Sequence, residues 1–116
     1  MEDMKEMEQK MNYDMNQQNP MTAETRSLLK NYESLLKLAA TEIYARAEDI
    51  APYLGSNKFD FRHACLDGQY QGCFPFFAVG KDRPTLKIPI VPFIGWISGI
   101  QTSTIYEAIE LAAAAA

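Results

Sequence analysis

The sequence predicts an α+β fold: a long N-terminal helix packed on a small antiparallel sheet of about three strands, followed by a C-terminal helix. Three observations predict it. Apolar residues recur at helical spacing over residues 20–50. From Phe59 onward, apolar and polar residues alternate with the period of a half-buried strand. The pattern Thr-Ile-Tyr-Glu, which begins at Thr104, matches a helix-capping box.

Length and charge narrow the class of protein. The chain has 116 residues and a net charge of −4, which indicates a single domain over residues 20–116, preceded by an acidic segment over residues 1–19. This balance disfavours nucleic-acid binding, which depends on clustered cations. The apolar run over residues 88–100 is too short to span a bilayer, so we expect no membrane partner. Two cysteines and an acidic start without an apolar leader favour the cytoplasm.

The acidic N-terminal segment carries methionines spaced by three, four and four residues, which is the period of one helical face. Flexible methionine side chains suit an adaptable contact surface. We therefore expect this face to become ordered by covering apolar surface on its own domain or on another chain. It is a candidate partner interface, formed by Met4, Met7, Met11 and Met15.

The long helix is expected to begin at Asn19-Pro20, a cap followed by a residue suited to the first turn, and to end before Pro52. Thirty helical residues would span about 45 Å. A compact domain of this length has a radius of gyration of only about 13 Å. Such a helix would project from the domain, and this mismatch predicts a homo-oligomer.

The remainder of the chain is interpreted as three strands joined by turns. The expected strands are residues 59–65, 69–79 (with a kink at Gly72 or Pro75) and 86–96, and the expected turns are Asp67-Gly68 and residues 80–84. Prolines inside the third strand indicate a sheet edge or an irregular extended segment. The predicted core is Leu28, Leu35, Ile43, Phe61, Phe76, Val79, Ile90 and Ile105.

No catalytic or metal-binding constellation stands out. In a strand, His63 and Cys65 share a face while Asp60 points away, so a nucleophile with an oriented base is not formed. The spacing of these residues and Cys73 matches no common zinc site. A two-residue turn at Asp67-Gly68 would put the two thiols on opposite faces, whereas a three-residue loop would pair them; we expect free thiols, and no cofactor.

Two surfaces are candidates for binding. Cations beside the Gly80 turn could hold an anion, although the turn lacks the length and hydroxyl of a phosphate-binding loop. The candidate ligand-binding residues are Lys81 and Arg83 at this turn, together with Arg62, His63 and Tyr70 in a pocket between the sheet and the long helix. Aromatic residues are dense over residues 70–96, and much of this run is expected to be core. The apolar segment over residues 88–100 is either a strand buried on both faces or a contact surface, with Phe93 and Trp96 at the partner interface.

These observations favour a non-enzymatic protein-binding module that acts as a homo-oligomer by occupying a partner's surface. Small acidic chains without motifs are common among accessory proteins of phages and mobile elements, including inhibitors of host defence. A small-ligand or nucleotide-binding protein, or a small enzyme, is the first alternative. A structural subunit of a larger assembly is the second.

Overall fold

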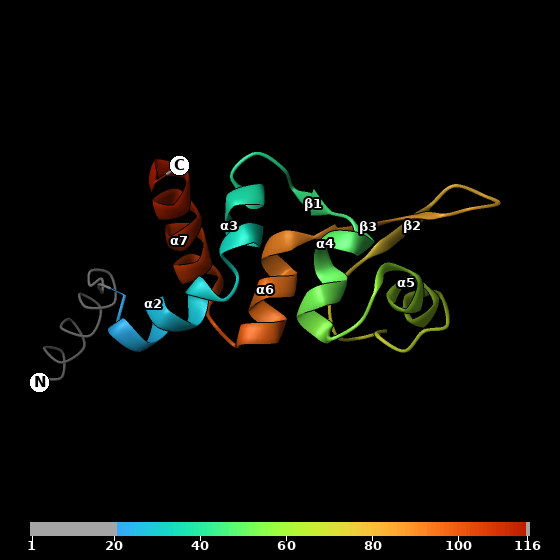
Figure 1. Ribbon diagram of the computed structural model, residues 1–116, viewed down its shortest axis with the longest axis horizontal. Coiled ribbons are helices and arrows are strands. Elements are labelled where there is room, and N and C mark those ends of the chain that lie inside the picture. The colour runs from blue at the N-terminus through green and yellow to red at the C-terminus, as the bar shows by residue number, and fades with distance from the viewer. Residues whose placement is uncertain (1–20, 116) are drawn as a thin grey trace, which may run out of the picture.

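A computed structural model of the protein describes residues 21–115 and confirms an α+β architecture with a three-stranded antiparallel sheet (Figure 1). Within these residues the α-helices are α2 (Ala23–Lys30), α3 (Glu33–Ala39), α4 (Ala47–Ile50), α5 (Lys58–Leu66), α6 (Ile90–Ser98) and α7 (Thr102–Ala115), and η2 (Ala51–Leu54) is a 3₁₀ helix. The strands are β1 (Tyr44–Ala45), β2 (Phe77–Val79) and β3 (Thr85–Pro89). The C-terminal helix is confirmed, although it begins two residues before Thr104.

The sheet has the order β1-β3-β2, so β3 is central, and within the described residues β2 has a free edge. In the β2–β3 hairpin, Phe77 lies opposite Lys87. Leu86 and Ile88 of β3 are buried, whereas the intervening Lys87 is exposed, which gives the alternation of a sheet with one covered face. Figure 1 shows the hairpin extending away from the helices at one end of the molecule.

The prediction of one long helix over residues 20–50 is wrong. The amides of Asn31 and Tyr32 bond to carbonyls three residues back, at 3.1 and 2.9 Å, which closes α2 with a tight turn before α3 begins. Pro52 does not end a long helix; it lies in the first turn of η2, where its missing N–H is not needed. Because no helix of 45 Å projects from the described domain, the length argument for an oligomer no longer holds.

Residues 58–66 form helix α5 instead of the expected strand. Phe61 and Cys65 are buried, while Phe59 and His63 are exposed, so each pair separated by four residues shares a helical face. Asn57 caps the helix by accepting a 2.9 Å bond from the amide of Asp60. Over so few residues, the alternation expected of a strand and the four-residue spacing expected of a helix fit the same sequence. The Asn57 cap favours the helix.

Asp67-Gly68 ends α5 and is not a hairpin turn. Gly68 has a φ of +86°, the left-handed conformation that closes many helices, and the Gln69 amide bonds to the Ala64 carbonyl at 2.9 Å. The expected strand over residues 69–79 is reduced to β2, because turns that include Gly72 at a φ of +87° occupy residues 67–73.

The third expected strand divides into β3 and helix α6. Pro92 is the third residue of α6, within the first turn, where backbone amides have no partner inside the helix. The prolines therefore mark a helix start, and the apolar character of the run reflects a buried helix. Nowhere in residues 21–115 is a helix both long and apolar enough to cross a membrane.

The core joins two packed groups of side chains. The helices α3, α6 and α7 pack together at one end, and an aromatic cluster lies between α5 and α6 at the other. Of the predicted core, Leu35, Phe61, Ile90 and Ile105 are buried and Phe76 is half-buried. The other three are exposed: Leu28, Ile43 and Val79. Those three errors follow from the overextended first helix and the overlong second strand.

Candidate functional site

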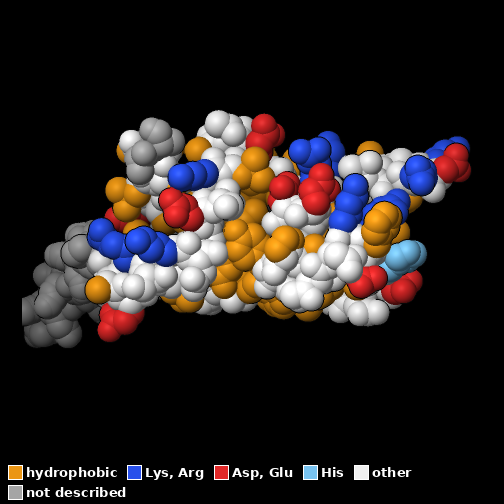
Figure 2. Space-filling view, in the orientation of Figure 1, with side chains coloured by type: hydrophobic (Ala, Val, Ile, Leu, Met, Phe, Trp, Pro, Cys, Tyr) orange, Lys and Arg blue, Asp and Glu red, His pale blue; other side chains and the backbone are white. Residues whose placement is uncertain are grey.

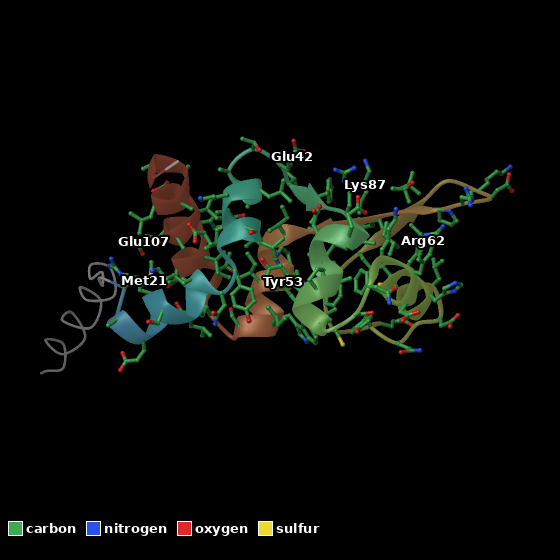
Figure 3. All side chains as sticks on the ribbon, in the orientation of Figure 1. Met21, Glu42, Tyr53, Arg62, Lys87 and Glu107 are labelled. Atoms are coloured by element: carbon green, nitrogen blue, oxygen red, sulfur yellow. The ribbon has the colours of Figure 1, made fainter. Side chains whose placement is uncertain are left out.

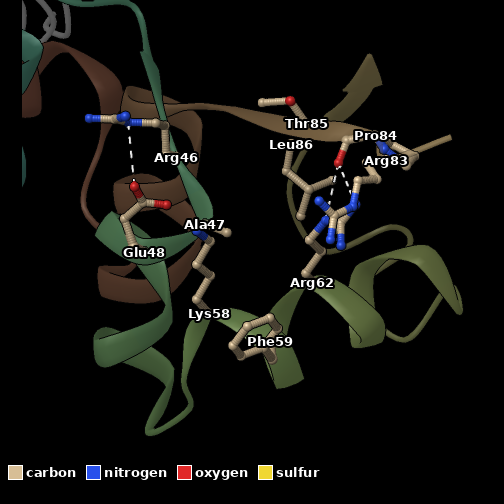
Figure 4. Close-up of a pocket in the computed structure, with 10 residues that line it drawn as sticks. All are labelled: Arg46, Ala47, Glu48, Lys58, Phe59, Arg62, Arg83, Pro84, Thr85 and Leu86. Atoms are coloured by element: carbon tan, nitrogen blue, oxygen red, sulfur yellow. Dashed lines mark hydrogen bonds and ion pairs between the residues drawn. The ribbon is translucent and has the colours of Figure 1, made fainter. Parts of the chain in front are cut away.

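A basic pocket lies where the starts of α4, α5 and β3 meet, with a cavity of about 430 Å³ (Figure 4). Its lining holds four cations and one carboxylate, namely Arg46, Lys58, Arg62, Arg83 and Glu48. Buried Ala47 and Leu86 also line it. Figure 2 shows Lys and Arg side chains gathered over this end of the molecule. The pocket therefore carries a net positive charge, and buried apolar side chains form part of its lining.

Two hydrogen bonds hold the Arg62 side chain in the basic pocket. Its Nε and Nη2 atoms both donate to the carbonyl oxygen of Pro84, at 3.1 and 2.7 Å. This fork fixes the guanidinium plane and ties α5 to a loop 22 residues away. The guanidinium keeps further N–H donors that these two bonds do not use.

Arg46 enters the basic pocket from the start of α4. Its backbone amide donates to Asp49 Oδ2 at 3.0 Å, which caps the helix and fixes the position of the residue. The Arg46 Nε atom lies 3.7 Å from Glu48 Oε2, and both side chains are largely exposed. Such an exposed pair contributes little stability, so Arg46 remains able to meet an incoming anion.

Lys58 and Phe59 stand at the rim. Lys58 and Arg62 are four residues apart on α5, which places both cations on one helical face. The Phe59 side chain between them in sequence is 70% exposed. Arg83 adds a further exposed cation from the hairpin loop. An exposed ring among cations is a combination typical of protein-binding surfaces.

The structure brings together only part of the predicted ligand-binding set. Arg62 and Arg83 line the basic pocket, whereas His63, Lys81 and Tyr70 do not. His63 is exposed on α5, and Lys81 lies in the hairpin loop. The Tyr70 ring packs in the aromatic cluster, 5.6 Å from Phe61 between ring centroids. The wall of the pocket is formed by α4 and α5, because residues 23–54 form several short elements and not one long helix.

Sequence reasoning missed Arg46, Lys58 and Phe59. A strand over residues 59–65 excludes Lys58 and separates it from Arg62. Two signals in the sequence could have indicated the helix that brings them together: the spacing of four residues between Lys58 and Arg62, and Asn57 as a helix cap. Arg46 could not have been found this way, because its place in the pocket depends on the packing of α4 beside β3.

The predicted partner-interface residues have different positions. Phe93 is fully buried, and its ring meets Phe74 edge-on at 5.1 Å, so it belongs to the core of this fold and not to an accessible surface. Trp96 is 41% exposed and packs 5.2 Å from Phe74. The methionine face, Met4, Met7, Met11 and Met15, lies outside the described residues.

Cys65 and Cys73 are free thiols. Cys65 is buried, and this burial raises the pKa of its thiol from 9.0 to about 11, which disfavours the nucleophilic thiolate. Over residues 21–115, no group of three His, Cys, Asp or Glu side chains is arranged to hold a metal ion. The chemistry that the described residues offer most clearly is the binding of anions at the basic pocket.

No family model, curated protein or solved structure matches this chain.

Proposed function

We propose that this protein is a non-enzymatic binding module that holds an acidic surface of a partner protein at its basic pocket. One observation carries the proposal: four cations and an exposed phenylalanine surround one cavity, against a single carboxylate. Carboxylates of a partner would meet Lys58, Arg83 and the free donors of Arg62, while an apolar side chain would cover Phe59. Arginine and aromatic side chains are the residue types that contribute most at such contacts.

The openness of the lining favours a protein over a small ligand. Small-molecule sites bury most of the ligand against predominantly apolar walls. Here Lys58, Phe59 and Arg83 are all exposed, and Arg62 directs two of its donors to Pro84. A phosphorylated ligand or nucleotide stays the second candidate, because the cavity volume falls in the usual range of small-molecule sites and the Phe59 ring could stack on a base.

Amide chemical shifts, measured by NMR during titration, test this proposal. The probes are an end-capped hexaglutamate peptide, ATP and a single-stranded oligothymidine. We expect the peptide to shift resonances of residues lining the pocket. The affinity should fall as salt is added, since exposed charges are screened within about 10 Å at 0.1 M salt.

A pair of charge reversals locates the binding. Arg83→Glu should weaken peptide binding about fivefold or more, because it places a carboxylate in the path of the ligand. Arg26→Glu, an equally large change of net charge on an exposed residue of α2, should leave the affinity unchanged. Equal losses from both variants, or a clear preference for ATP or the oligonucleotide, would contradict the proposal.

A further inference from the structure

The outer face of the β2–β3 hairpin carries apolar side chains that nothing in the described part of the chain covers. Phe77 and Val79 are each 51% exposed, and they alternate on one face of β2. The Tyr44 ring, in β1 across the sheet, meets Phe77 edge-on at 6.2 Å, and Lys87 Nζ lies 5.7 Å from the Tyr44 ring centroid. Figure 3 shows Lys87 projecting away from the helices.

The edge of β2 is open as well as its face. Among residues 21–115, β2 pairs only with β3, so within this part of the chain the other side of β2 has backbone donors and acceptors without a strand partner. Natural sheets usually protect such an edge with lysine, proline or an inward charge. Residues 76–80 contain none of these, and the whole run from Cys73 to Gly80 is uncharged. This edge is therefore suited to pairing with another strand.

We propose that β2 pairs antiparallel with β2 of a second copy, about a two-fold axis at Ala78. In this register Phe77 lies opposite Val79 of the second copy, and Val79 opposite its Phe77. Aromatic and β-branched residues are a favourable cross-strand pair. The same three-residue strand is thus complementary to itself, which is what a two-fold interface requires.

Charge favours this arrangement over face-to-face stacking of two hairpins. Stacked faces would bring Lys87 of each copy into one apolar interface, where a buried unpaired cation is costly. Edge pairing keeps the two β3 strands three strand spacings apart, about 14 Å. At that distance the two lysines are largely screened at physiological salt. Because residues 73–80 are uncharged, no like charges meet along the paired edge.

The contact area sets the expected strength. Stable interfaces bury about 800 Å² on each partner, and a three-residue strand with its neighbouring side chains provides less. We therefore expect a reversible dimer with a dissociation constant on the order of 10–100 μM. The loop at the tip of the hairpin projects beyond the helices (Figure 1).

Sedimentation velocity of the full chain, over about 1–500 μM, tests the dimer. Phe77→Glu and Val79→Lys should each weaken association at least tenfold, while the double variant should recover it, because each introduced carboxylate then lies opposite an introduced ammonium. Leu111→Glu is the matched control: Leu111 is also 51% exposed, on α7, and its substitution should change nothing. Circular dichroism verifies that the variants fold.

A cysteine pair tests the register itself. In a Cys73→Ser background, Ala78→Cys should form a disulfide-linked dimer, because directly opposite Cα atoms lie about 5 Å apart. Val79→Cys should not, since its two copies would be about 8 Å apart, beyond disulfide reach. A chain that stays monomeric at all concentrations, a dimer that persists in Phe77→Glu, or equal cross-linking of both cysteine variants would overturn the proposal. Peptide binding at the basic pocket is measured separately, so either idea can fail alone.

Discussion

Replacement of Arg62 should separate the structural from the binding role of this residue. Arg62→Ala removes both donors to the Pro84 carbonyl. Hydrogen bonds from charged groups contribute about 1.5–3 kcal/mol each, but Pro84 is only half-buried and water can replace part of the loss. We expect a decrease of about 1–2 kcal/mol in the free energy of unfolding. Arg62→Lys should lose about half as much, because an ammonium cannot reproduce the planar fork.

Urea unfolding followed by far-UV circular dichroism measures this decrease, with an unchanged m-value as the sign that only stability has changed. Peptide titration then gives the binding role: Arg62→Ala should weaken binding, and Arg62→Lys should largely retain it because the charge remains. Arg83→Ala is the control, since this exposed side chain should affect binding but not stability. An Arg62→Ala protein as stable as the parent would refute the argument that this fork holds the hairpin to α5.

Three further predictions concern the core, the buried thiol and the N-terminal segment. Leu35→Ala should destabilise the protein by about 2–5 kcal/mol, since Leu35 is 1% exposed; a loss well below 1 kcal/mol in urea unfolding would contradict its place in the core. Burial raises the pKa of the Cys65 thiol from 9.0 to about 11, so on raising the pH the thiol of the unfolded chain ionises before that of the folded chain. The free energy of unfolding should therefore fall between pH 9 and 11, by at most about 3 kcal/mol. Cys65→Ala should lack this part of the pH dependence. Deletion of residues 1–18 should leave the domain folded but weaken self-association or partner binding; unchanged sedimentation and peptide affinity would make the segment a passive tail.

The elements that could be predicted from the sequence were those with an unambiguous local signal. The C-terminal helix and the α+β class follow from periodicity and a capping pattern. The interpretation of residues 59–65 failed because alternation over seven residues fits a strand as well as it fits two helical faces. Asn57, which caps α5 at 2.9 Å from the Asp60 amide, carried the deciding information.

Other features could not have been read from local sequence. The turn after α2 depends on amides of Asn31 and Tyr32 closing on α2, while the apolar stripe continues past them in sequence. The basic pocket depends on three elements that meet only in the folded chain. Arg83 was predicted as a cation of the Gly80 turn, and Arg62 as part of a pocket between the sheet and a long helix. Their proximity to Arg46 depends on the tertiary fold.

The basic pocket and the β2 edge share one hairpin, and this predicts how they should influence each other. The pocket uses residues 83–86 from the α5 side, whereas the proposed dimer uses the free edge of β2. Side chains without shared partners usually act additively. Lys58→Glu should therefore weaken peptide binding without altering the dimer, and Phe77→Glu should do the reverse.

Arg62 is the exception, because its bonds to the Pro84 carbonyl connect the pocket to the hairpin. In Arg62→Ala the hairpin loses its attachment to α5, so both peptide affinity and dimerisation should fall. Sedimentation of each variant with and without saturating hexaglutamate measures this coupling. If Lys58→Glu shifts the dimer as much as Arg62→Ala does, the charge of the pocket links the two surfaces, and the rigid attachment of the hairpin does not.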